Sequence, residues 1–173
     1  MDYKSIEPKE LQGNVFDLIG EKWMLITALK DGGAYNTMAA SWGGMGVMWG
    51  KPIAWCVVRP VRYTYEFMEA ADYFTLTFFP EEHRKALNIL GTKSGRVCDK
   101  ILESGLTPAF LGLDGKDAVY FEEADTVMAC RKLYYQDVNP LNFTDETLDK
   151  GNYPKKDYHR MYFGEIVSCL VKE

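Results

Sequence analysis

The sequence lacks several features on which common protein classes depend. Its four cysteines, Cys56, Cys98, Cys130 and Cys169, lie far apart and form no Cys-x-x-Cys pair. We therefore expect reduced, mostly buried thiols and no zinc or iron–sulfur site. No apolar run approaches the roughly 20 residues that span a bilayer, and no positively charged start precedes an apolar segment at the N-terminus. These absences predict a cytoplasmic protein without a membrane partner.

Catalytic motifs are also scarce. Only two histidines are available as an imidazole base. His83 lies in a charged run, which favours a solvated helix face, and for His159 a place in a pocket is the less favoured of two interpretations. No Gly-x-Ser-x-Gly, no Gly-x-x-x-x-Gly-Lys-Ser/Thr and no correctly spaced dinucleotide glycine motif occurs. A triad hydrolase, an ATP-driven enzyme and a Rossmann domain are therefore not expected, and neither is a metal centre.

The charge and length narrow the remaining classes. The formal net charge of −5 argues against a nucleic-acid partner, because nonspecific phosphate attraction needs a basic surface. The 173 residues suit a single domain spanning 1–173. Aromatic residues make up 14% of the chain, so some rings either fill the core or line a pocket or an interface.

Strand signals outnumber helix signals along the chain. Apolar, β-branched and aromatic runs predict strands at 23–28, 53–58, 73–79, 118–121, 124–135 and 160–172, while 34–49 reads as a strand followed by an irregular, glycine-rich loop. Helical segments are predicted at 66–71, at 81–90 closed by Gly91, and from an N-cap at Ser94 to Gly105. Residues 136–159 predict a long surface excursion. This pattern favours a β-rich α+β domain over a parallel βαβ sheet.

Three polar clusters are candidates for binding an anionic ligand. Lys93, Ser94, Gly95 and Arg96, with Lys100, place cations and backbone amides near a predicted helix start, although a capped surface helix is the favoured interpretation when the cluster is taken alone. Residues 59–64 offer two guanidinium groups after a buried strand, or else an ordinary solvated strand end. Residues 36–42 combine small side chains, hydroxyls, an amide and an indole, or else form a tightly packed strand.

Taken in order, these clusters resemble the flavin reductase-like FMN-binding split-barrel family, which includes the flavoredoxins. The resemblance is carried by Asn36–Trp42, Trp49-x-x-Pro52, Val58-Arg59-Pro60-x-Arg62-Tyr63-Thr64, Ser94-Gly95-Arg96 with Asp99-Lys100, Cys130, and His159 followed by Gly164-Glu165-Ile166. It implies an antiparallel Greek-key split β-barrel of six strands with flanking helices. It also implies a homodimer with FMN near the subunit interface.

The resemblance further implies a role for each matching residue. Asn36, Thr37, Met38, Ala39, Ala40 and Ser41 would line the isoalloxazine and ribityl chain, and Trp42 or Trp49 would stack on or shield the ring. Arg59, Tyr63 and Thr64 would approach the ribityl-phosphate. Ser94, Arg96 and Lys100 would complete the phosphate site. No catalytic side chain is expected, because a flavin carries out hydride or electron transfer itself.

The implied function is an FMN-dependent oxidoreductase. Electrons would pass from NAD(P)H or a reduced protein through FMN to a flavin, iron or another acceptor. One alternative is a flavoredoxin-type electron carrier with little NAD(P)H turnover, which would work with an electron-transfer protein partner. A second alternative is a noncatalytic barrel that binds partners through its aromatic surface.

Overall fold

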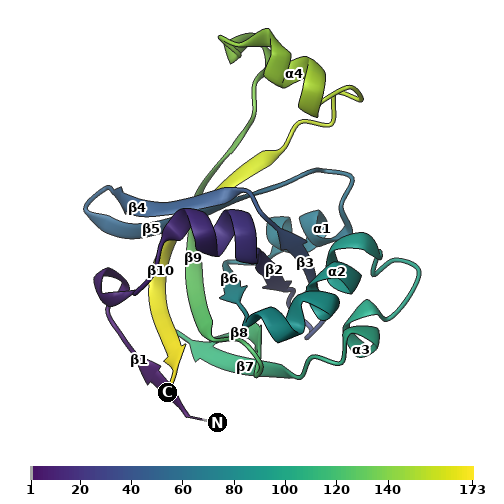
Figure 1. Ribbon diagram of the computed structural model, residues 1–173. Helices are drawn as coiled ribbons and strands as arrows, with labels where there is room; N and C mark the ends of the chain where they lie inside the picture. Colours follow the sequence, from purple (N-terminus) through teal and green to yellow (C-terminus); the bar gives the residue numbers. More distant parts are fainter. Residues whose placement is uncertain (1) are drawn as a thin grey trace.

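The computed structural model describes residues 2–173, and antiparallel strands dominate it (Figure 1). An eight-stranded sheet runs in the order β3-β2-β6-β9-β10-β5-β4, with β1 paired to β10. The strands of this sheet are β1 (Tyr3–Ser5), β2 (Met24–Leu29), β3 (Tyr35–Ala40), β4 (Gly43–Met48), β5 (Lys51–Val58), β6 (Tyr73–Phe78), β9 (Thr126–Asp137) and β10 (Arg160–Lys172). A separate hairpin contains β7 (Pro108–Leu113) and β8 (Lys116–Phe121).

The two ends of the main sheet come together without pairing. β3 and β4 lie at opposite ends of the strand order, yet only Ser41 and Trp42 separate them along the chain. Gly43 at the start of β4 lies so close to β2 that an added Cβ would be 2.9 Å from the terminal methyl carbon of Met24. The sheet therefore curls into a barrel that stays open between β3 and β4. This is the predicted split barrel, although its sheet has eight strands instead of six.

Two of the helices cover the barrel on the flank formed by β2 and β3. The helical elements are η1 (Pro8–Glu10), η2 (Asp17–Lys22), α1 (Tyr63–Ala70), η3 (Glu81–His83), α2 (Arg84–Thr92), α3 (Lys100–Ser104), η4 (Pro140–Asn142) and α4 (Glu146–Asn152). α1 packs against β2 and β3, and α2 packs against β3. Gly91 of α2 comes so close to β3 that a Cβ there would lie 3.1 Å from Cβ of Ala39.

Most strands predicted from the sequence are confirmed, but the irregular loop at 34–49 is wrong. The second half of that segment is β4, which pairs with β5 through a tight turn at Trp49 and Gly50. Both turn residues have positive φ, 55° and 67°, as a two-residue type I′ hairpin turn requires. The glycines of β4 do not break the strand because Trp55 of β5 lies against Gly44, where a Cβ would collide with the indole.

Two helix predictions need correction. The helix expected over 81–90 begins with a 3₁₀ turn and continues through Gly91 to Thr92, since the missing side chain of Gly91 allows α2 to approach β3. The helix expected from Ser94 begins only at Lys100, because Asp99 accepts a hydrogen bond from the backbone N–H of Leu102 and caps it. Gly105 ends it in the left-handed conformation, as predicted. Strand β7 was not predicted.

The surface excursion at 136–159 is confirmed as an arm that projects from the barrel (Figure 1). The ends of β9 and β10 lead into it, and it carries η4 and α4. Neither of these helical elements contains a buried residue. The packing of the arm instead centres on the buried Tyr153, whose ring lies 4.8 Å from that of Tyr158 and 6.0 Å from that of Phe143 between centroids.

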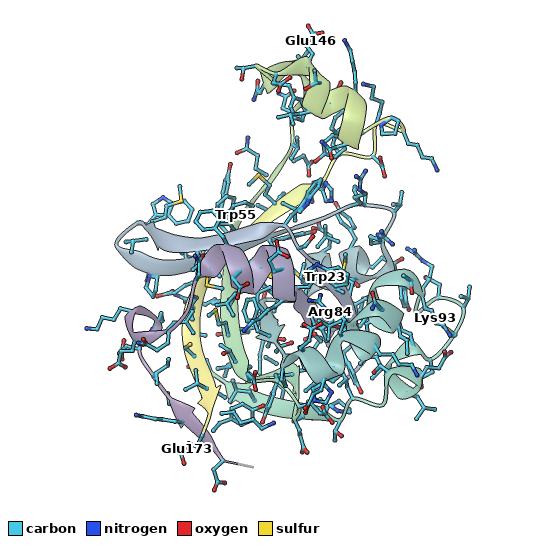
Figure 2. The ribbon with its side chains drawn as sticks, in the orientation of Figure 1. Trp23, Trp55, Arg84, Lys93, Glu146 and Glu173 are labelled. Atoms are coloured by element: carbon cyan, nitrogen blue, oxygen red, sulfur yellow. The ribbon has the colours of Figure 1, made fainter. Side chains whose placement is uncertain are left out.

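The aromatic residues are shared between the core and one outer face of the sheet. Tyr162 and Phe74 are almost fully buried. Outside the core, rings from β5, β10 and β9 form a continuous cluster, in which neighbouring centroids lie 5.9–6.3 Å apart. Its members are Trp49, Trp55, Tyr134 and Phe163, and Figure 2 shows Trp55 beside the β4–β5 hairpin.

Among the described residues, no helix is both long and apolar enough to cross a membrane.

Gly164 provides a test of the barrel packing. A Cβ at this β10 position would lie 2.7 Å from Cβ of Cys130 and 2.8 Å from the Phe74 ring. Gly164→Ala should lower the free energy of unfolding by about 1–3 kcal/mol, the usual cost of overpacking a core. Gly46→Ala in β4 is the matched control, since no atom lies within 4 Å of its added Cβ. Urea unfolding measures both, and equal stabilities would contradict this packing.

Candidate functional site: a groove along the edge of strand β3

The outer edge of β3 has no strand partner in the described structure. β3 pairs only with β2, residue for residue from Tyr35–Leu29 to Ala40–Met24. In an antiparallel strand every second residue directs its N–H and C=O away from its partner. The edge is flanked by α2, by the start of α1 and by the loop after α2. The free backbone groups of β3 therefore face a sheltered groove. The groove has two connected halves.

The first half, the strand-edge groove, has a volume of about 300 Å³. Its floor consists of residues 38–42, and its walls carry Val57, Arg59, Arg62 and His159. The small side chains of Ala39 and Ala40 leave the backbone accessible to a flat ligand. The Trp42 ring closes one end, with its centroid 5.1 Å from that of His159.

The second half, the cationic groove, has a volume of about 400 Å³ and shares Met38, Arg59 and Arg62 with the first. It also collects polar side chains from the loop that follows α2, from the starts of α1 and α3, from β3 and from the projecting arm. These include Lys93, Ser94, Tyr63, Thr64, Lys100 and Asn36, and one carboxylate, Asp157. Positive charge is therefore concentrated at one end of a groove in a protein of net negative charge.

Lys100 is the least usual of these cations because it is buried without a carboxylate partner in the described structure. Its side chain is 4% exposed, and Nζ donates a hydrogen bond of 2.8 Å to the carbonyl oxygen of Leu90. Burial, followed by repulsion from Arg62, lowers its pKa to about 8. A buried charge of this kind is costly unless an opposite charge or hydrogen bonds compensate it. An anion in the cationic groove would supply that charge.

Asn36 and Gly95 fix the junction between β3 and the loop after α2. The Asn36 side chain is buried and donates a 2.8 Å hydrogen bond to the Thr64 hydroxyl. An added Cβ at Gly95 would lie 2.5 Å from the Asn36 side-chain oxygen. Only glycine therefore lets the loop come close enough to place Ser94 beside the groove.

Arg59 connects the groove to the projecting arm. Its guanidinium donates 2.8 Å hydrogen bonds to the Asp157 carboxylate and to the carbonyl oxygen of Asn152, and it lies 5.0 Å from the centre of the Tyr153 ring. The same residue lines both halves of the groove. The arm is thus held to the barrel through a residue of the site.

His159 lines the strand-edge groove as a neutral imidazole. It is 9% exposed, and its Nδ1 lies 2.8 Å from the Tyr153 hydroxyl. Burial, followed by the positive charge of Arg59, lowers its pKa to about 4. The pocket position that the sequence interpretation favoured less is therefore the one found. His83 instead lies in η3 beside Phe79, away from the groove.

Most residues assigned to the site through the family resemblance meet in this groove. They are Asn36, Met38, Ala39, Ala40, Ser41, Trp42, Arg59, Tyr63, Thr64, Ser94 and Lys100. Three other residues that the resemblance assigned to the site, Thr37, Arg96 and Trp49, do not line the groove. The Thr37 hydroxyl points to the interior, 2.8 Å from that of Thr27. Arg96 is held by Glu66 and the carbonyl oxygen of Val61, and Trp49 belongs to the outer ring cluster.

The assignment by resemblance omitted several groove residues, among them Arg62, Lys93 and His159. Arg62 and Lys93 lie within the polar clusters of the sequence, and their charge was the available signal. His159 belonged to the family pattern, but no role was assigned to it there. Its role as a groove wall depends on how β10 returns beside β5, with Arg160 opposite Val58.

The low pKa of His159 predicts a pH-dependent stability. An unfolded histidine titrates near 6.5, so the unfolded state binds the proton more tightly and native stability falls as pH drops from about 6.5 toward 4. His159→Gln should remove about 1–2 kcal/mol of the stability loss between pH 7 and pH 5. Urea unfolding at the two pH values measures this. An unchanged loss would contradict a buried neutral imidazole.

Comparison with known proteins agrees with this architecture. Among solved structures, a flavoredoxin from Methanosarcina acetivorans matches with a TM-score of 0.66 and 23% identity, over 97% of this chain and 77% of the other. An FMN-binding domain of a flavin reductases-like enzyme from Shewanella baltica OS155 matches with a TM-score of 0.67 and 16% identity, over 98% and 77%. These likenesses show a shared fold.

A third solved structure, an FMN-binding protein from Thermus thermophilus with bound p-hydroxybenzaldehyde, matches with a TM-score of 0.64 and 21% identity, over 97% of this chain and 83% of the other. No curated protein sequence matches at a significant level. The family model described as "Flavin reductase like domain" matches residues 17–173. The chain therefore belongs to the flavin reductase-like family.

Proposed function

We propose that this protein binds FMN in the groove beside β3 and acts as an oxidoreductase. NAD(P)H or a reduced protein would supply the electrons, and a flavin, iron or another carrier would accept them. Bound FMN supplies the hydride and electron chemistry, while the protein supplies binding, orientation and electrostatics. The buried ammonium of Lys100, which has no carboxylate partner among residues 2–173, is the observation that carries the proposal.

The two halves of the groove match the two ends of FMN. A phosphomonoester carries about −1.5 to −2 charges near neutral pH, and the cationic groove offers Lys100, Arg62 and Arg59. The strand-edge groove offers free backbone groups and two alanines, which suits a flat ring system with polar edges. The groove thus combines an apolar slot with a phosphate site.

The residues of the groove have distinct tasks in this proposal. Lys100 and Arg62 hold the phosphate and so set the position of the ring along β3. Free N–H groups of β3 donate to the polar edge of the ring, where negative charge develops on reduction. The neutral imidazole of His159 leaves the strand-edge groove less positive than a protonated histidine would.

Replacing Lys100 tests the phosphate site. Lys100→Met should weaken FMN binding about tenfold or more, because a charge-assisted hydrogen bond contributes about 1.5–3 kcal/mol. Lys132→Met is the matched control, since Lys132 is also partly buried and bonds the backbone carbonyls of Met68 and Glu69, outside the groove. Quenching of flavin fluorescence measures both affinities. Equal affinities in the two variants would contradict the assignment.

Anaerobic reduction distinguishes the enzyme from the electron carrier. We expect NADH or NADPH to bleach the absorbance of bound flavin within seconds of mixing in a stopped-flow spectrometer. Bound flavin that only dithionite or a reduced protein bleaches would favour the flavoredoxin-type carrier, with an electron-transfer protein as its partner. Failure to bind FMN at all would favour the noncatalytic barrel.

We also propose that the protein forms a homodimer through the outer ring cluster, with FMN near the interface. Val47, Met48 and Trp49 at the β4–β5 turn and Tyr134 on β9 are exposed, and apolar patches of this kind commonly mark interfaces. A second copy fits because β4, which pairs with β5, has no strand on its outer edge among the described residues, while the opposite end of the same sheet forms the groove.

Trp49→Glu tests the dimer. A charge at this exposed position should shift the protein from dimer to monomer, because a desolvated carboxylate without a partner is costly. Light scattering after size-exclusion chromatography gives the mass of each species. Phe16→Glu is the control, because Phe16 is 87% exposed and not part of the ring cluster. A monomeric native protein would contradict the proposal.

A further inference from the structure

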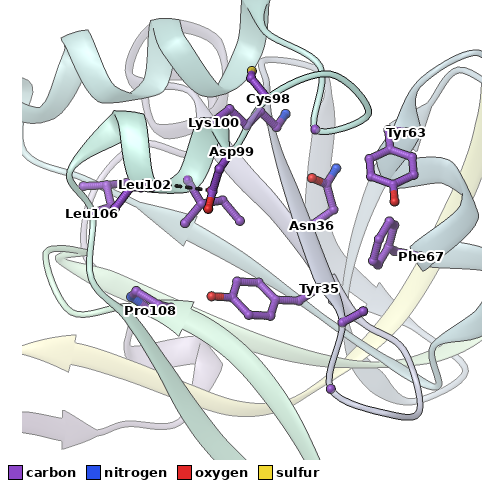
Figure 3. A pocket seen from close by; sticks show the side chains of 14 residues that line it. Tyr35, Asn36, Tyr63, Phe67, Cys98, Asp99, Lys100, Leu102, Leu106 and Pro108 are labelled. Atoms are coloured by element: carbon purple, nitrogen blue, oxygen red, sulfur yellow. Dashed lines mark hydrogen bonds between the residues drawn. The ribbon is translucent and has the colours of Figure 1, made fainter.

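A separate cavity lies on the far side of the loop that follows α2. It is bounded by the start of β3, by α1 and by α3, and its volume is about 630 Å³. Figure 3 shows Tyr35, Tyr63 and Phe67 on its walls, together with Asp99 at the start of α3. We call this space the α1–α3 cavity. The proposed FMN site makes no use of it.

Gly95 separates the α1–α3 cavity from the cationic groove. An added Cβ at Gly95 would lie 2.5 Å from Oδ1 of Asn36 and 3.1 Å from Cδ1 of Tyr63. The loop and these two side chains are therefore in close contact, and they form a wall with one space on each side. Lys100 also borders both spaces, but its ammonium is directed to the carbonyl oxygen of Leu90 at 2.8 Å. A ligand in the cavity would not occupy the groove.

One side of the cavity is aromatic. The Tyr63 and Phe67 rings meet edge to face, with centroids 5.0 Å apart and ring planes at 86°. A planar ring in the cavity can extend this cluster, because aromatic rings attract one another in edge-to-face and offset-stacked arrangements. The volume also lies within the range of about 300–1,000 Å³ that is usual for small-molecule pockets. This side of the cavity therefore suits an aromatic ligand.

The opposite side of the cavity carries hydrogen-bonding groups. Figure 3 shows the Tyr35 hydroxyl and the Asp99 carboxylate on the side away from Tyr63 and Phe67. One oxygen of Asp99 accepts a 3.0 Å hydrogen bond from the backbone N–H of Leu102, and its second oxygen can accept from a ligand. Burial, followed by the charge of Asp99, raises the pKa of Tyr35, so its hydroxyl stays protonated. These groups can pair with a hydroxyl on the ligand.

The charges around the cavity favour an uncharged ligand. Nζ of Lys30 lies 4.2 Å from the centre of the Phe67 ring, and the Arg96 guanidinium lies 4.9 Å from that of Tyr63. Neither of these two cations lines the cavity, so both contact the rings from outside it. A cationic ligand on the same rings would be repelled by them, whereas an anionic ligand would be repelled by the Asp99 carboxylate.

We propose that the α1–α3 cavity binds an uncharged aromatic molecule that carries a hydroxyl group. The ring of this ligand lies against Tyr63 and Phe67. Its hydroxyl donates to the Asp99 carboxylate and accepts from the Tyr35 hydroxyl. The inference does not depend on which ligand occupies the groove beside β3.

Three naphthalene derivatives test the selection by charge. At neutral pH 2-naphthol is uncharged, 2-naphthoate is an anion and 2-naphthylmethylamine is a cation. We expect 2-naphthol to bind with a Kd below about 1 mM, a modest affinity for about eleven non-hydrogen atoms, and both ions to bind at least about tenfold more weakly. Isothermal titration calorimetry measures all three affinities. Equal affinities for the three compounds, or no binding of 2-naphthol, would overturn the proposal.

Replacing a wall residue tests the location of the site. Tyr35→Ala removes a ring and a hydroxyl from the cavity. The control is Tyr135→Ala, because Tyr135 is 51% exposed and lies on β9 outside the cavity. We expect Tyr35→Ala to weaken 2-naphthol binding about tenfold or more and Tyr135→Ala to leave it unchanged. The same affinity in both variants would contradict the location.

Asp99→Asn changes the charge of the cavity while keeping the helix cap, because asparagine caps a helix as well as aspartate does. We expect weaker binding of 2-naphthol and tighter binding of 2-naphthoate, so that their affinity ratio falls at least about threefold. An unchanged ratio would show that the carboxylate does not face the ligand and would overturn the proposal.

Competition with FMN distinguishes the cavity from the groove. We expect saturating FMN to leave the 2-naphthol affinity unchanged, because the wall at Gly95 stands between the two sites. Displacement of 2-naphthol by FMN would place both compounds in the groove. That result would overturn this inference and leave the proposed function standing.

Discussion

The free edge of β3 is the constraint on which the rest of this structure depends. An uncovered strand edge attracts further strands and promotes aggregation, yet here it must stay open for the proposed ligand. The chain resolves this conflict with a short strand, six residues long, and with helices that flank the edge without pairing to it. Gly91 and Gly95 set how closely those flanking segments approach β3. The split in the barrel is therefore a sheltered opening.

The same arrangement explains how an acidic protein could hold the phosphate of the proposed FMN. The overall charge is −5, but local fields depend on which charges face a groove and how much water separates them. Arg59 and Arg62 arrive from the end of β5, and Lys100 arrives from α3. Arg96 and Lys30 instead pair with Glu66 at the surface. The net charge of a chain does not reveal which cations face a groove and which form ion pairs at the surface.

The sequence predicted the fold and much of the site for physical reasons that can be stated. Alternation of apolar and β-branched residues identified strands such as β6, and Gly105 marked the end of α3. Glycine misled the prediction at β4, because the space it leaves is filled by Trp55 from the neighbouring strand. Ser94 had the chemistry of an N-cap, but Asp99 takes that position.

The local sequence pattern did not predict the direction in which each side chain points, toward the groove or toward the interior. Thr37 and Met38 are neighbours in one predicted strand, but Thr37 faces the interior and Met38 the groove. Arg59 and Arg96 looked equivalent as cations. Their difference follows from partners far away in the sequence, the arm for Arg59 and Glu66 for Arg96. The position of His159 likewise depends on long-range pairing of β10 with β5.

Arg59 links the occupancy of the groove to the position of the arm. Its guanidinium holds Asp157 and Asn152 while lining the space beside β3. A ligand that draws this guanidinium toward itself weakens the attachment of the arm, and by reciprocity a partner that pulls on the arm changes the affinity for that ligand by the same factor. A contact made far from the groove, at the projecting arm, would in this way change ligand binding in the groove.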